Sequence, residues 1–171
     1  MGRTTIQFIV LWVVLVLVQV IFSKIMLFDV ATPIVFIYLL LRLPIGLSYN
    51  IVFTVAFITG LTIDMYNNTQ GMNALSSLLI SSIRTKVFYT FVTRDDETVH
   101  IIPSIKSVGT GNYLKYAGSL TFIYCLLVFF IQAFTFHNVP LTLMRIVCSF
   151  ALSLVLIYAI DSLVNTRREK R

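Results

Sequence analysis

Residues 6–22 read IQFIVLWVVLVLVQVIF, a run of 17 residues without a charged side chain. In lipid a helix satisfies all of its own backbone hydrogen bonds, so a run of this length and composition predicts a membrane helix. The preceding residues resemble the start of a signal peptide, but the run ends in Phe-Ser-Lys without a small-residue cleavage site. We therefore expect this helix to remain as an anchor.

The rest of the chain has the same apolar character. Of its 171 residues, 58% are hydrophobic and 12% are charged, against about 25% charged in ordinary soluble domains. This composition excludes a water-soluble globular protein, and the length allows at most about six membrane spans. Thirteen basic and seven acidic residues give a net charge of +6, which on so apolar a chain indicates orientation in a membrane, not nucleic-acid binding.

Five further apolar runs predict an all-α, polytopic membrane bundle of about six helices, in a single domain covering residues 1–171. The second run contains Pro33 and stops at Arg42, so we expect a short or partly inserted helix whose arginine reaches the headgroups. The fourth run is interrupted by Arg84 and Lys86, which we also expect at the headgroups. The predicted spans are residues 6–22, 30–41, 49–65, 72–83, 113–134 and 141–160.

Two polar segments lie outside these spans. Residues 93–112 are expected to form a solvated loop, and residues 165–171 a basic tail. Over alternate loops of a six-span chain, 11 Lys and Arg residues fall on one side and one, Lys24, falls on the other. The excess of positive charge predicts that both termini and the charged loop are cytoplasmic.

Asp64 and Arg145 are charged residues that lie inside predicted spans. Asp64 is one turn before Asn67, where it could cap the turn or reach the outer headgroups, and an intramembrane acid is also a functional candidate. Arg145 lies roughly 8 Å below Pro140 at about 1.5 Å per residue. We expect Asp64 and Arg145 to pair or to share a polar network, because each charge alone in lipid costs around 2.5 to 3.5 kcal/mol on insertion scales. Asp29 is the competing partner for the arginine.

Small residues form one face on each of the third and fourth spans. Such faces let helix backbones approach closely, and Asn73 beside them can hydrogen-bond across helices. We expect these faces mainly to pack the two helices of the hairpin tightly together. A binding surface for a partner helix is their expected secondary role. The face residues are Ala56, Gly60, Ala74, Ser77 and Ser81.

No motif indicates catalysis or metal binding. The acidic residues 95–97 and His100 are metal-ligand types, but consecutive acids point in different directions, which favours a solvated loop. Nucleophile-elbow, zinc-helix and phosphate-loop motifs are absent from the sequence. We therefore expect no enzymatic activity, no cofactor and no metal.

A spaced motif extends from the third span into the fourth, with FITGLTID at residues 57–64 and NTQGMNAL at residues 68–75. Its spacing is Gly60-x3-Asp64-x6-Gly71-x2-Ala74. Supporting stretches are FDVATP at 28–33, RDDE at 94–97, PSIK at 103–106 and KYA at 115–117. In this order and spacing, the motifs resemble the rod-shape-determining MreD family, in the branch found in Bacteroidetes.

The resemblance implies a non-enzymatic scaffold in the bacterial inner (cytoplasmic) membrane. Such a scaffold binds the periplasmic protein MreC and works with RodA and a penicillin-binding protein in peptidoglycan synthesis and rod shape. Its surroundings are membrane lipids, and no nucleic acid is involved. The partner-binding or structural candidates are Gly60, Asp64, Gly71, Asn73, Ala74 and Arg145.

The same resemblance implies a fold similar to the S-components of energy-coupling-factor transporters, so a substrate-binding subunit of a vitamin transporter is the alternative. S-components typically dock their coupling subunit through an Ala-x3-Ala face on the first helix, whereas residues 6–22 contain neither Ala nor Gly. An intramembrane enzyme acting on lipid-linked intermediates is a third possibility. It would require Asp64 or Asp161 to be catalytic without an evident partner.

Overall fold

The computed structural model describes residues 2–24, 32–93, 101–132 and 139–169, and every regular element in these ranges is a helix. The expectation of an all-α protein is confirmed for this part of the chain. The helices are α1 (Gly2–Lys24), α2 (Ile37–Arg42), α3 (Tyr49–Asn67), α4 (Met72–Phe91), α5 (Ile105–Val108), α6 (Thr110–Gln132) and α7 (Val139–Glu169).

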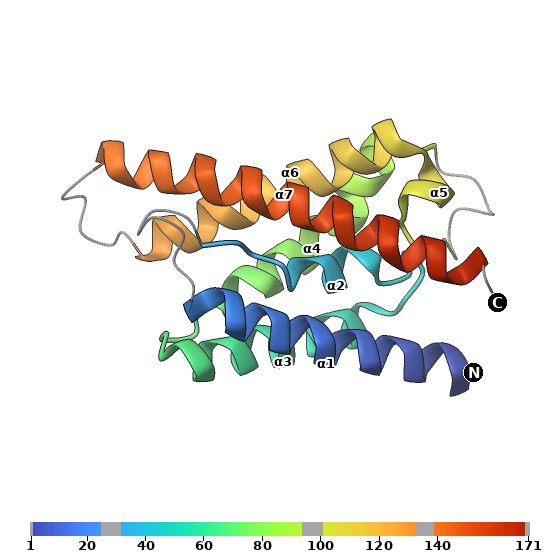
Figure 1. Cartoon of the computed structure of the whole chain (residues 1–171), viewed down its shortest axis with the longest axis horizontal. Helices are drawn as coiled ribbons and strands as arrows, with labels where there is room; N and C mark the ends of the chain where they lie inside the picture. Colours follow the sequence, from blue (N-terminus) through green and yellow to red (C-terminus); the bar gives the residue numbers. More distant parts are fainter. Residues whose placement is uncertain (1, 25–31, 94–100, 133–138, 170–171) are drawn as a thin grey trace.

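Helices α1 and α3 form one pair and α6 and α7 another, with α2 between the pairs, and α4 packs against both α3 and α6 (Figure 1). A hydrogen bond of 2.9 Å from Trp12 Nε1 to Thr59 Oγ1 joins the first pair. In the second pair, the rings of Phe122 and Phe150 meet edge to face. The first turn of α1, the last turn of α7 and α5 lie at one end of the molecule, here called the terminal end. The α3–α4 turn lies at the opposite end, here called the hairpin end.

Three helices of the described chain are long and apolar enough to cross a membrane, fewer than the six spans that the sequence predicts. Helix α4 has 20 residues but holds Arg84, Lys86 and four serines, and α2 has only six residues. Length and composition are thus compatible with a membrane protein. The three helices cover Tyr49–Asn67, Thr110–Ile131 and Thr142–Val164, and Phe8–Ser23 is a shorter apolar stretch.

The second predicted span is a short helix, as expected, preceded by non-helical chain. Such backbone cannot face lipid, because its peptide groups would lack partners. The Gln19 side chain on α1 accepts from Val35 N (2.7 Å) and Phe36 N (3.3 Å) and donates to Pro33 O (3.1 Å). From α7, Ser149 and Ser153 accept from the amides of Thr32 and Ile34 (3.1 and 2.8 Å).

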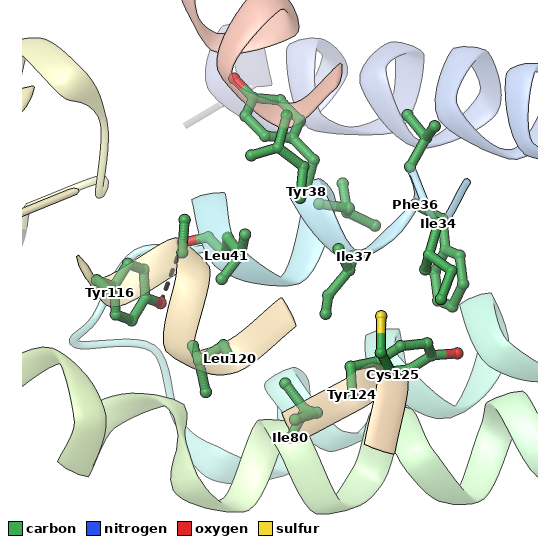
Figure 2. Packing of buried hydrophobic residues seen from close by; sticks show 14 of the residues in the cluster. Ile34, Phe36, Ile37, Tyr38, Leu41, Ile80, Tyr116, Leu120, Tyr124 and Cys125 are labelled. Atoms are coloured by element: carbon green, nitrogen blue, oxygen red, sulfur yellow. Dashed lines mark hydrogen bonds between the residues drawn. The ribbon is translucent and has the colours of Figure 1, made fainter. Parts of the chain in front are cut away.

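The side chains of α2 and of the chain before it form the centre of the core (Figure 2). Phe36 packs edge to face on Tyr124, with ring centroids 5.5 Å apart. In a membrane, where the surroundings of a helix are as apolar as leucine, close packing and polar contacts contribute more to the stability of such a core than removal from water. The residues labelled in this core are Ile34, Phe36, Ile37, Tyr38, Leu41, Ile80, Tyr116, Leu120, Tyr124 and Cys125.

Two helices extend beyond the predicted spans. Helix α4 continues without a break past Arg84 to Phe91, and α7 continues to Glu169, through part of the predicted tail. The segment 93–112 is not wholly solvated, because it contains α5, and Pro103 and Ser104 in it are buried. These differences arise where charged or polar residues find partners inside the bundle, which local hydropathy does not report.

Candidate functional site

The α3–α4 hairpin brings together five of the six candidate residues. At Gly60, a Cβ atom would lie 2.5 Å from Ala74 Cα and 2.7 Å from Asn73 O, closer than any real Cβ contact. Only glycine therefore allows the backbone of α4 to approach α3 this closely. The predicted close packing of the small faces is confirmed, since Ala56, Ala74, Ser77 and Ser81 are all buried.

Asp64 caps the first turn of α4 from the neighbouring helix. Its carboxylate accepts hydrogen bonds from Asn73 N (3.1 Å), Ala74 N (2.8 Å), Asn73 Nδ2 (2.8 Å) and the Thr69 hydroxyl. The first amides of a helix have no partner within it, and a negative charge there is favourable. Gly71, the residue at the N-cap, has φ +76° and no side chain to serve as a cap.

The spaced motif therefore has a joint geometric meaning. Gly60 sets the distance between the helices, Gly71 turns the chain into α4, and Asp64 satisfies the amides that this turn leaves open. Asn73 extends the network to α6, because Tyr124 Oη donates to Asn73 Oδ1 at 2.7 Å. The prediction that Asn73 bonds across helices is confirmed.

Arg145, the sixth candidate, lies apart from this network, and the predicted ion pair with Asp64 is wrong. Both oxygens of Asp64 are occupied by the hairpin. Arg145 is half-buried, and its Nε atom has no hydrogen-bond partner within the described ranges. Asp29, the competing partner, lies outside the described residues.

A second polar cluster, which the sequence analysis missed, lies toward the terminal end. Arg42 Nη1 and Asp161 Oδ1 form an ion pair at 3.1 Å, with exposed fractions of 3% and 0%. Tyr38 Oη also donates to Asp161 Oδ1 (2.9 Å) and contacts Arg42 Nη1. The other carboxylate oxygen accepts from Ile105 N at 2.9 Å. Arg42 is thus held inside the bundle, and its expected position at the headgroups is wrong.

Arg84 is also inside the bundle, contrary to its expected place at the headgroups. Its exposed fraction is 1%. Its guanidinium donates to the carbonyls of Leu40 (3.0 Å), Leu43 (2.6 Å) and Pro44 (2.9 Å). The last carbonyls of a helix lack partners within it, so a cation placed there satisfies them and interacts favourably with the helix dipole. Arg84 is therefore the C-terminal cap of α2.

The polar groups of both clusters link one helix or segment to another. Each oxygen of Asp64 and of Asp161 already accepts at least one hydrogen bond, and both residues are buried. Within the described chain, no group of three or more His, Cys, Asp or Glu is placed to hold a metal. The acidic residues 95–97 and His100 lie outside those ranges.

Comparison with known proteins adds no family to these observations: no protein-family model, no curated protein and no solved structure matches this chain.

Proposed function

We propose that this chain is a non-enzymatic scaffold of the cell-elongation machinery in the bacterial cytoplasmic membrane. In this proposal it crosses the membrane six times, both termini are cytoplasmic, and MreC binds at the hairpin end, which is periplasmic. RodA and a penicillin-binding protein act with the assembled pair. The basis is the resemblance of the spaced motif to the MreD family, together with the excess of positive charge on one side.

The six crossings are compatible with the position of the central segment. Residues 32–42 pass through the bundle between α1 and α7, whose side chains satisfy the non-helical backbone. Irregular backbone is tolerated at membrane depth when protein surrounds it. Helix α4 buries Arg84 and three of its four serines, Ser76, Ser77 and Ser81, so its low hydropathy does not prevent it from crossing within a bundle.

The structural observation that best supports the proposal is the hydrogen-bonded α3–α4 turn. Because Asp64 holds the turn in one conformation, little conformational entropy is lost in ordering its outer residues when a partner binds. Met65 and Tyr66 next to the turn are 74% and 57% exposed. These two side chains are the proposed contacts to MreC.

The two buried acids favour a scaffold over the intramembrane enzyme. A catalytic carboxylate must reach the proton or atom that it acts on. Asp64 and Asp161 are instead engaged by backbone amides, Thr69, Tyr38 and Arg42. For the vitamin-transporter alternative, the absence of Ala and Gly from residues 6–22 remains the opposing feature.

Affinity measurements with purified full-length proteins in detergent test the proposal. We expect a stable complex with MreC, about tenfold weaker binding for Tyr66→Ala, and unchanged binding for the control Tyr158→Ala, which removes an exposed tyrosine from α7. Tight vitamin binding without MreC association would overturn the scaffold in favour of the transporter. Equal effects of the two tyrosine variants would place the MreC contact elsewhere.

A further inference from the structure

Hydrogen bonds at Ile101 and Ile105 attach the segment 101–109, which includes α5, to the rest of the bundle. Ile45 N donates to Ile101 O at 3.2 Å, and Ile105 N donates to Asp161 Oδ2 at 2.9 Å. Between these points Pro103 and Ser104 are buried. The segment thus lies against the chain that follows α2 and against α7.

Asp161 joins this segment to α2. One of its oxygens accepts from Tyr38 and Arg42 of α2, and the other accepts from the Ile105 amide at the start of α5. A single carboxylate on α7 therefore links α2 and α5. Loss of the α5 contact leaves the pairing with Arg42 possible, because it uses the other oxygen.

Helix α5 depends on such attachments, because its four residues are too few for a stable isolated helix. Its own contribution is a capping box in which the Ser104 and Ser107 side chains bond each other's backbone amides. The α3–α4 turn has its own hydrogen bonds around Asp64, which do not involve the segment 101–109.

We propose that residues 101–109 form a clasp that opens locally. Opening breaks the Ile105–Asp161 and Ile45–Ile101 hydrogen bonds, uncovers the Arg42–Asp161 pair to the terminal end and loosens the C-terminal turn of α2. The α3–α4 hairpin stays folded. The clasp is thus a conformational device that couples the loop before α6 to the buried helix α2, and it does not depend on the identity of the proposed partner.

Ile105→Pro tests the clasp with a matched control. Proline lacks the amide proton, is tolerated in the first turn of a helix, and suits the extended Ser104 before it (φ −158°, ψ 165°). Ile105→Ala loses the same side-chain packing but keeps the amide. By hydrogen–deuterium exchange of the full chain in detergent, we expect exchange in 101–109 and 37–45 to rise about tenfold more in Ile105→Pro than in Ile105→Ala. Exchange in 64–74 should be unchanged.

Asp161→Asn provides a second test of the same contact. The asparagine oxygen can face Arg42 only if its amino group faces the Ile105 amide, so one attachment is lost. The control is Asp64→Asn at the hairpin end, which should raise exchange in 64–74 and not in 101–109. Equal exchange in the proline and alanine variants, or a uniform rise over the whole chain in both asparagine variants, would overturn the clasp.

Discussion

The close contact between Gly60 and Ala74 is possible because glycine has no Cβ atom. In Gly60→Ala the new Cβ would meet the backbone of α4, which cannot rotate away as a side chain could. We expect a loss of about 1 to 3 kcal/mol in the free energy of unfolding, from overpacking. The control is Gly118→Ala on α6, where the Cβ would lie 4.0 Å from the Leu154 methyl groups. Thermal unfolding in detergent should show Gly118→Ala unchanged or more stable, by up to about 1 kcal/mol.

Asp64 and Arg145 provide a test of whether two individual side chains interact with each other. They share no partner within the described chain, so their substitutions should be independent. We expect the losses in unfolding free energy of Asp64→Asn and Arg145→Gln to add in the double variant to within about 0.5 kcal/mol. A loss in the double variant clearly smaller than the sum of the two single losses would instead support the ion pair predicted from the sequence.

At the scale of elements, α2 depends on a cap supplied by another helix. Replacing Arg84 with methionine keeps a long apolar side chain but leaves the buried carbonyls of Leu40 and Leu43 without a donor. We expect a loss of about 2 to 5 kcal/mol in unfolding free energy, since each orphaned buried group costs about 1 to 3 kcal/mol. The matched control is Lys86→Met two residues further along α4, where the side chain is exposed. A change of similar size in both variants would show that charge on α4, and not the cap, is responsible.

At the scale of the whole molecule, the arrangement of the ends predicts sidedness. Gln70 is exposed at the hairpin end and Lys106 is exposed on α5 at the terminal end. Single cysteines at these positions, with Cys125 and Cys148 replaced by alanine, should be labelled by an impermeant maleimide from the periplasm and from the cytoplasm respectively. Labelling of both from one side would contradict a crossing by α4 and with it the six-pass topology.

Features that depend on neighbouring residues in the chain were predictable. The apolar runs predicted the long helices. Pro33 and the shortness of its run predicted a short α2, and the small residues around Gly60 predicted the close α3–α4 contact. Asn73 was assigned its cross-helix role correctly for the same reason. In each case the determinant is a pattern within one helix or one turn, which the sequence displays directly.

The partners of the buried charges were decided by the tertiary structure alone. Arg42 is separated from Asp161 by 119 positions, and Arg84 from Leu40 by 44. An arginine at the end of an apolar run has the same local sequence whether it extends to the headgroups or turns inward. The choice depends on whether the bundle places a carboxylate or free carbonyls within reach, because only such partners offset the cost of burying its charge.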